Sequence, residues 1–202
     1  MYSYIFDLGS VLVNYDGMKV IKRLEEISGV ESSLIEPLFR HELVYQVETN
    51  RISSEEFFKL HVKKIIDNIT YDKWIEAFMD IFSPNLPAIE LLHYIKRKSR
   101  KTYILSNLAE FDKIALEKKI EGIFQYCDYN FFSYELGFHK PERQIYEAVY
   151  NKIGEKPENS VFFDDLPQNI EGAKKAGMIG ILYSNENIDK IYEEINRLEN
   201  WK

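Results

Sequence analysis

The strongest constraint on the fold is an alternation of short apolar runs with helix-length segments in the second half of the chain. Parallel strands joined by helices in right-handed crossovers produce this order. The strand-like runs lie at 102–105, 129–132, 161–163 and 179–182. A fifth run, Tyr2–Phe6, opens the chain and stops at Asp7. We therefore expect an α/β fold with a doubly wound parallel sheet.

A long helical segment separates the first strand from the other four. Helical periodicity runs from Gly17 to about Phe82, and no strand pattern interrupts it. The break Ser83–Pro87 contains two prolines and suits a linker. We expect a core domain made of residues 1–16 and 83–202, with residues 17–82 inserted after the first strand as a small helical domain.

Two helix starts within the insertion are marked by capping residues. Ser53 and Glu56 have the spacing of a capping box, in which each side chain binds the other residue's free backbone N–H. Thr70 is predicted to be the next N-cap. The aromatic residues of the insertion fall at helical spacing and predict its core; they are Phe57, Phe58, Trp74, Phe78 and Phe82.

Composition excludes several classes of protein. Of the 202 residues, 45% are hydrophobic, which is ample for a packed core. The formal charge of −7 is opposite to that of nucleic-acid binders, so any bound phosphate needs a local cationic site. The single cysteine, Cys127, permits no internal disulfide and fits a reducing compartment. We find no signal peptide or membrane span, and we expect a cytoplasmic protein.

Polar residues follow four of the five predicted strands. The carboxyl ends of strands in an open α/β sheet meet at one crevice, where ligands bind. Each cluster alone is typical of a turn or a helix cap, so their joint placement carries the argument. The clusters are Asp7-Leu8-Gly9-Ser10, Ser106-Asn107, Lys140-Pro141 and Asp164-Asp165.

These clusters, in this order, resemble the motifs of the haloacid dehalogenase (HAD) superfamily. The resemblance covers nearly the whole chain, and within the superfamily it is closest to bacterial α-D-glucose-1-phosphate phosphatases, which share the Asp-Leu-Gly start. The matching stretches are Phe6–Leu12, Ile104–Asn107, Gly137–Pro141 and Phe162–Met178. The resemblance implies a Rossmann-like core, with the insertion as the family's helical cap. Tyr45–Ser53 is also similar, although Asn50 stands where glycine is expected.

Together the residues and the resemblance predict a phosphatase that acts on a small phosphorylated metabolite. Asp7 is the expected nucleophile, which forms an aspartyl-phosphate that water hydrolyses. Mg²⁺ prefers hard oxygen ligands, and Asp7, the Gly9 carbonyl and Asp165 supply them. From the family pattern, Asp165 has the direct role and Asp164 is an alternate or supporting metal ligand.

The transferring phosphoryl group also needs positive charge and hydrogen-bond donors. Lys140 is expected to act as a point charge for the phosphate and for Asp7. Ser106 and Asn107 are expected to bind phosphoryl oxygens, through the Ser106 hydroxyl and nearby backbone N–H groups. Asn169 either orients the loop after Asp165 or is a plain helix cap or surface amide; the sequence favours neither interpretation.

Gly9 is the informative departure from the family pattern. Most phosphatases of the superfamily have a second aspartate two positions after the nucleophile, and this aspartate transfers protons to and from the substrate. Glycine has no side chain that can transfer a proton. Either the substrate has a good leaving group, such as a sugar 1-phosphate, or another residue donates the proton. His139 and Asp16 are the nearby candidates, although a histidine covering the cap interface is the simpler interpretation of His139.

Two other functions compete with the phosphatase. A dehalogenase using an aspartyl ester needs no metal, which leaves Asp164-Asp165 without a purpose. A catalytically idle binding or regulatory member is supported only by Gly9. A cap helix or loop that faces the crevice is expected to contain Tyr15, Tyr45 and Gln46. These side chains either contact a sugar or pack against the rest of the protein.

Overall fold

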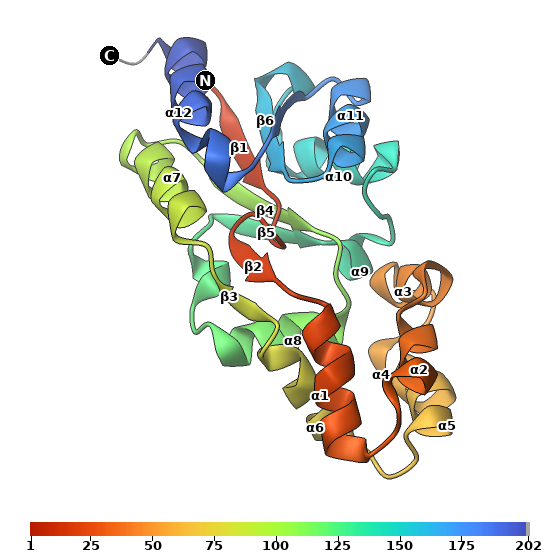
Figure 1. The fold of residues 1–202 in the computed structure, drawn as a ribbon. Helices are drawn as coiled ribbons and strands as arrows, with labels where there is room; N and C mark the ends of the chain where they lie inside the picture. Colours follow the sequence, from red (N-terminus) through yellow and green to blue (C-terminus); the bar gives the residue numbers. More distant parts are fainter. Residues whose placement is uncertain (201–202) are drawn as a thin grey trace.

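A parallel sheet of five strands forms the centre of the protein, whose computed structural model describes residues 1–200 (Figure 1). The strand order is β5-β4-β1-β6-β7, which places β1 in the middle. The strands are β1 (Ser3–Phe6), β4 (Thr102–Ser106), β5 (Tyr129–Phe132), β6 (Ser160–Asp164) and β7 (Ile179–Leu182). All four pairings are parallel. The predicted doubly wound α/β fold is confirmed.

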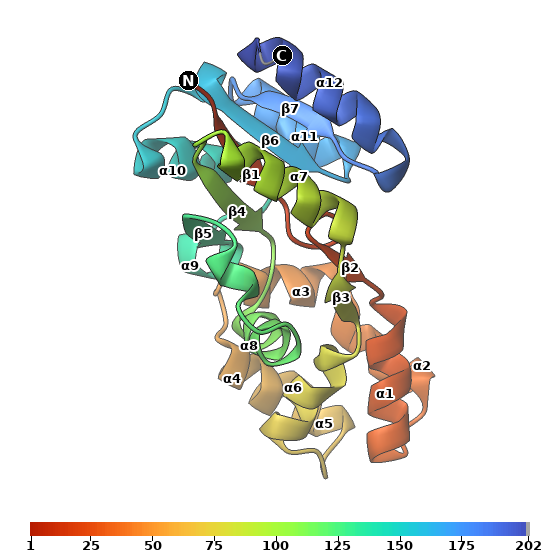
Figure 2. The same ribbon diagram turned by 90° about the vertical axis from the view of Figure 1, so that its left-hand side faces the viewer.

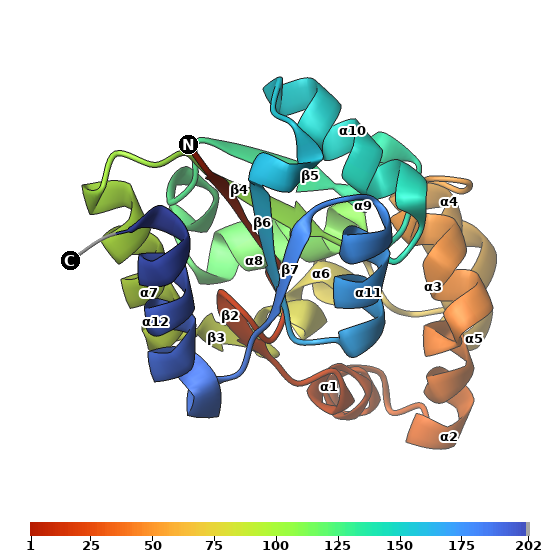
Figure 3. The same ribbon diagram turned by 90° about the horizontal axis from the view of Figure 1, so that it is seen from above.

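Helices cover both faces of the sheet. In Figure 3, α7 and α12 lie on one side of the strands and α10 and α11 on the other. These helices are α7 (Leu86–Arg97), α10 (Arg143–Ile153), α11 (Pro167–Lys175) and α12 (Ile188–Glu199). Alternation along β1 explains both layers, since Tyr4 and Phe6 belong to one core cluster and Ile5 to the other. Because both faces are covered, the whole of β1 is buried.

A second, two-stranded sheet was not predicted. Strand β2 (Val13–Tyr15) pairs antiparallel with β3 (Phe82–Pro84), in a register that joins Val13 to Pro84 and Tyr15 to Phe82. The expectation that Ser83–Pro87 is a linker is therefore wrong at four of its five residues, because Ser83 and Pro84 belong to β3 and Leu86 and Pro87 begin α7. Three-residue strands are too short to show a period, and their partners lie far apart in the sequence. This ribbon connects the sheet to the helical segment (Figure 2).

Between β2 and β3 the described chain contains only helices and turns. The α-helices are α1 (Met18–Ser28), α2 (Ser32–Ile35), α3 (His41–Glu48), α4 (Ser54–Phe57), α5 (Lys63–Ile65) and α6 (Tyr71–Met79). A 3-10 turn at Glu36–Phe39 and a π-helical turn at Phe58–Val62 join some of them. The Ser53–Glu56 capping box is confirmed, as is the Thr70 N-cap, which accepts the Lys73 N–H at 3.3 Å.

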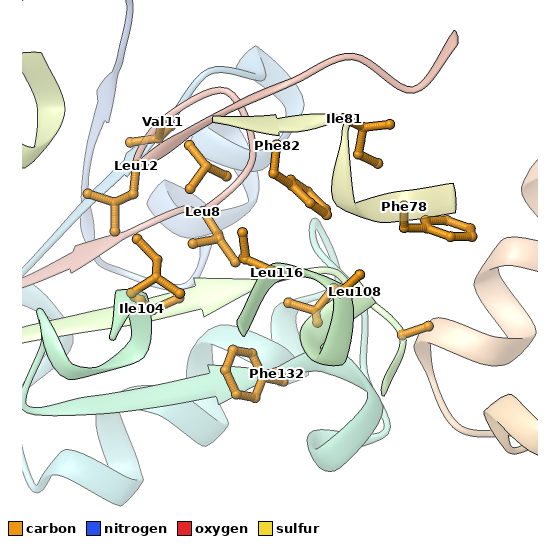
Figure 4. Close-up of a cluster of buried hydrophobic side chains, with 14 of the residues drawn as sticks. Leu8, Val11, Leu12, Phe78, Ile81, Phe82, Ile104, Leu108, Leu116 and Phe132 are labelled. Carbon is orange, nitrogen blue, oxygen red and sulfur yellow. The ribbon is translucent and has the colours of Figure 1, made fainter. Parts of the chain in front are cut away.

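Helix α8 (Glu110–Lys119), which follows β4, packs against this helical segment as well as against the sheet. Its Phe111 ring lies 5.0 Å from the ring centre of Phe78 and 5.5 Å from that of Trp74, both in α6. One continuous apolar cluster therefore runs from the sheet into the helices. Figure 4 shows its middle, where Leu8, which belongs to the first polar cluster, lies near Leu108 and Leu116.

The remaining regular elements are short. They are α9 (Ser133–Leu136) and the 3-10 turns Ile123–Gln125, Pro157–Asn159 and Asn185–Asn187. Among residues 1–200, no helix has the length and apolar character needed to cross a membrane.

Candidate active site

The four polar clusters surround one cavity of about 350 Å³ at the carboxyl ends of β1, β4 and β6. The cavity is also bounded by the ribbon, by α3 and by α8. Its lining residues are Asp7, Leu8, Gly9, Ser10, Tyr15, Glu48, Phe82, Ser106, Asn107, Leu108, Asp112, Leu116, Lys140, Asp165, Leu166 and Asn169. The predicted site residues Asp7, Gly9, Ser106, Asn107, Lys140 and Asp165 are thus all present at one crevice.

Lys140 is the cationic centre of this site. Its Nζ lies 2.6 Å from Asp7 Oδ1 and 2.8 Å from Asp164 Oδ2, and it also donates to the Leu105 carbonyl at 3.2 Å. Only 2% of the Lys140 side chain is exposed. Burial alone lowers the pKa of an ammonium group, but the two carboxylates outweigh it and raise the pKa of Lys140. The ammonium group therefore stays charged.

Asp164 lies beneath the cavity, fully buried, and its oxygens are occupied by protein donors. Oδ1 accepts from the Leu166 N–H at 2.9 Å and from Asn169 Nδ2 at 2.9 Å. Oδ2 accepts from Lys140 Nζ and from Asn169 Nδ2 at 3.0 Å. A carboxylate offers about four acceptor positions, so none is left over. Asn169 is thus neither a surface amide nor a plain cap, because it orients Asp164.

Asp7 and Asp165 face the cavity with their carboxyl groups. Burial raises the pKa of Asp7 to about 7, with Asp164 adding to the rise and Lys140 opposing it. Burial and the neighbouring Asp164 also raise the pKa of Asp165. Both pKa values are raised because several carboxylates lie close together away from solvent. A bound cation would lower both pKa values by stabilising the charged forms.

The side chain of Asn107 holds the loop that contains Lys140. Its Oδ1 accepts the Lys140 backbone N–H at 2.8 Å, and its Nδ2 donates to the Lys140 carbonyl at 3.1 Å. The side-chain amide thus fixes the backbone of the lysine loop, and the binding of a phosphoryl oxygen by backbone N–H groups near Ser106 and Asn107 stays a prediction. The Ser106 hydroxyl, by contrast, has only a 3.5 Å contact with the Asn107 carbonyl and remains available at the cavity wall.

Neither candidate for the missing proton donor lines the cavity. His139 Nε2 lies 2.6 Å from Glu48 Oε2, and its Nδ1 lies 2.7 Å from the Lys140 carbonyl oxygen, so both ring nitrogens are engaged. The simpler interpretation of His139, as a contact with the helical segment, is confirmed. Asp16 is half exposed and pairs with Lys19 at 3.4 Å.

The space beside Gly9 is open. A Cβ atom built there meets no heavy atom within 4 Å, and the backbone of Gly9 does not have the positive φ that favours glycine. Its lack of a side chain is therefore not imposed by packing or by the local backbone.

Three polar residues of the cavity, Tyr15, Glu48 and Asp112, were not identified as site residues from the motifs. Glu48 comes from α3 and Asp112 from α8, and only Tyr15 had been noted as a possible contact. Tyr15 and Asp112 lie outside every matching stretch, and Glu48 lies in the Tyr45–Ser53 segment without having been marked as a site residue; only the tertiary structure brings the three together. Tyr45 and Gln46 do not line the cavity, and the Tyr45 hydroxyl donates to Glu142 Oε1 at 2.6 Å.

The acidic residues fit a divalent cation. One carboxylate oxygen each from Asp7, Asp164 and Asp165 lies within 4.8 Å of the others, although the hydrogen bonds to Asp164 leave it to contribute negative charge rather than a free ligand atom. Carboxylate oxygens are the ligands that Mg²⁺ prefers. Cys127 takes no part in this chemistry, because burial raises the pKa of its thiol to about 12.

Known phosphatases are similar to this chain in sequence. D-ribitol-5-phosphate phosphatase of Bacteroides thetaiotaomicron is 27% identical over 181 residues, covering 86% of this chain and 87% of that enzyme. Phosphorylated carbohydrates phosphatase of Thermotoga maritima is 24% identical over 146 residues, covering 71% of this chain and 62% of that enzyme.

A solved structure shows the same architecture. The magnesium complex of a HAD family enzyme from Bacteroides thetaiotaomicron superposes with a TM-score of 0.77 at 25% identity, covering 91% of this chain and 93% of that one. A family model described as haloacid dehalogenase-like hydrolase matches residues 3–177. With its sheet, its site and its phosphatase relatives, the chain belongs to the haloacid dehalogenase-like hydrolases and is a phosphoric monoester hydrolase of that family.

Proposed function

We propose that the protein is a Mg²⁺-dependent phosphatase that hydrolyses a sugar phosphate such as glucose 1-phosphate through an aspartyl-phosphate on Asp7. The observation that carries this proposal is the buried Lys140 ammonium, 2.6 Å from Asp7, beside a cluster of three carboxylates. The named relatives that act on phosphorylated carbohydrates and the neighbouring magnesium complex support it.

In this mechanism Asp7 supplies the nucleophilic oxygen. A carboxylate oxygen of Asp7 bonds to phosphorus while the bond from phosphorus to the leaving oxygen breaks, and that oxygen takes up a proton as the alcohol departs. Water then attacks phosphorus, which releases inorganic phosphate and regenerates the carboxylate. Lys140 holds Asp7 in place and offsets the charge of the transferring group, while the Ser106 hydroxyl donates to a phosphoryl oxygen.

We assign the metal ligands from the free oxygen atoms of the site. Asp7, the Gly9 carbonyl and Asp165 would hold Mg²⁺, which when bound neutralises phosphoryl charge. The four hydrogen bonds to Asp164 favour a supporting role, in which it holds Lys140 and the loop at Leu166.

We further propose that residues 17–82 act as a cap over this cavity. Two contacts support a closed position: Glu48 with His139 at 2.6 Å and Tyr45 with Glu142 at 2.6 Å. Both join α3 to the loop around Lys140, so closure would shield the reacting group from bulk water. The packing of α6 on Phe111 makes α8 part of the surface on which the cap rests.

Hydrolysis of an aryl phosphate with and without Mg²⁺ tests the proposed function. We expect turnover with Mg²⁺, its loss when EDTA removes the metal, and its return on adding Mg²⁺. Release of halide from a 2-haloacid without any metal would instead identify a dehalogenase, and absence of both activities would support a binding protein.

Gly9→Asp tests how the leaving group is protonated. The parent lacks an acid at this position, so its kcat/KM for glucose 1-phosphate should exceed that for glucose 6-phosphate, whose alkoxide is the poorer leaving group. The space beside Gly9 is open to a side chain. An aspartate placed there as a general acid should lower the ratio of kcat/KM for glucose 1-phosphate to kcat/KM for glucose 6-phosphate about tenfold or more.

The matched control is Gly9→Asn, which has the same size but no carboxyl proton and should leave the ratio wide. A parent enzyme that hydrolyses both glucose phosphates equally well would contradict the idea that the site lacks a proton donor.

A further inference from the structure

A second cavity adjoins the one that contains Asp7. It has a volume of about 170 Å³ and shares Tyr15, Glu48 and Asp112 with the first cavity. Its other walls are apolar and mostly aromatic; they are Leu38, Phe39, Val44, Val47, Phe57, Trp74, Phe78 and Phe111. Three polar side chains thus stand between the phosphate end of the site and an aromatic chamber under the helices of residues 17–82.

The Asp112 side chain makes a single hydrogen bond with the rest of the described chain. Its Oδ2 accepts the Ala109 N–H at 3.0 Å, and no ion pair with Asp112 occurs within residues 1–200. Burial and the nearby Glu48 carboxylate raise the pKa of Asp112 to about 8. Burial therefore favours the protonated form of this carboxyl group, which both donates and accepts hydrogen bonds.

The aromatic chamber contains an unsatisfied donor. Trp74 is fully buried, and its Nε1–H has no hydrogen-bond partner in the part of the chain that the structure describes. Buried indole N–H groups in proteins are normally paired. Because Trp74 lines the chamber, an oxygen atom of a bound molecule is a suitable partner.

These groups together suit a polyhydroxylated carbon skeleton. Carboxyl groups bind hydroxyls, and aromatic faces, which carry negative partial charge, attract polarised C–H groups. A cationic alcohol fits less well. The raised pKa of Asp112 disfavours its charged form, and one oxygen of Glu48 is already occupied by His139 at 2.6 Å, so this wall offers little to bind a cation.

We propose that Asp112, with Glu48, binds hydroxyl groups of the leaving alcohol and so selects sugar or polyol phosphates, the alcohol pointing from the phosphate toward the aromatic chamber. This inference rests on the proposed phosphatase function and assigns the selectivity to a residue of α8 that no motif marks. Asp112 acts at the far end of the substrate, away from the reacting phosphorus.

The test compares two classes of substrate in the full-length enzyme with Mg²⁺. One is the best-hydrolysed member of a panel of sugar and polyol phosphates; the other is phenyl phosphate, whose leaving group offers no hydroxyl beyond the reacting oxygen. Asp112→Leu should lower kcat/KM for the sugar or polyol phosphate at least tenfold more than for phenyl phosphate, mainly through KM.

Two further variants distinguish the loss of hydrogen bonds to the substrate from a structural effect of the substitution. Asp112→Asn keeps an acceptor for the Ala109 N–H and can still bind hydroxyls, so it should restore most of the lost selectivity. Glu110→Leu, on the exposed side of the same helix, should leave the ratio of the two kcat/KM values unchanged. Thermal unfolding of each variant checks that the fold persists.

An equal loss for both substrates in Asp112→Leu would overturn the proposal, as would a ratio unchanged from the parent. A parent that prefers choline phosphate to every sugar and polyol phosphate would also overturn it, in favour of a cation site. Failure of the parent to hydrolyse phenyl phosphate would contradict the proposed phosphatase function itself, so the two failures are distinguishable.

Discussion

Asp7→Asn is expected to lower kcat for aryl and sugar phosphates by at least about 10³-fold, because a carboxamide oxygen is a far weaker nucleophile than a carboxylate. The fold should survive. Burial already disfavours the charged form of Asp7, as its raised pKa shows, and asparagine has the same size without the charge.

Acid quenching during turnover separates the covalent mechanism from direct attack by water. The parent should retain a phosphoryl group on the protein, and Asp7→Asn should not. Asp189→Asn, an exposed aspartate in α12, is the matched control and should match the parent in both measurements. A variant at Asp7 that still turns over at a near-parent rate would exclude Asp7 as the nucleophile.

Lys140→Met should abolish most activity and also destabilise the protein. Removing the ammonium group leaves Asp7 and Asp164 buried without their cation, and breaking a buried ion pair on one side typically costs about 3–5 kcal/mol. For a chain of this size that loss corresponds to a decrease in Tm of roughly 10 °C in metal-free buffer.

The pH dependence of the loss of stability in Lys140→Met gives a second measurement. In the parent the pKa of Asp7 already lies above its ordinary value of 3.8, so the folded state binds the proton more tightly than the unfolded state does. Without Lys140 the pKa of folded Asp7 rises further, so the stability deficit of the variant relative to the parent should deepen as the pH rises above about 7, where the parent loses this proton and the variant keeps it.

Lys101→Met is the matched control, because Lys101 is exposed and pairs with Asp128 at 3.2 Å on the surface. It should cost less than about 1 kcal/mol. Equal Tm values for Lys140→Met and the parent would show that the buried carboxylates do not depend on this lysine.

The sequence by itself determined which residues meet at the crevice. Asp7, Ser106 and Asp165 each end or follow a buried strand, and parallel strands in register place such residues at one edge. The strands at 129–132 and 179–182 were predicted with their observed bounds, since apolar runs of this length between helical segments leave little ambiguity.

Only the tertiary structure decided how the polar groups share their hydrogen bonds and what forms the far end of the cavity. Asn107 clamps the Lys140 backbone, 33 positions away, and Glu48 reaches His139 across 91 positions. Asp112 looks in the sequence like an ordinary acidic residue in the first turn of a helix. Such contacts depend on how helices pack, and packing brings single side chains together without leaving a spacing that a linear pattern records.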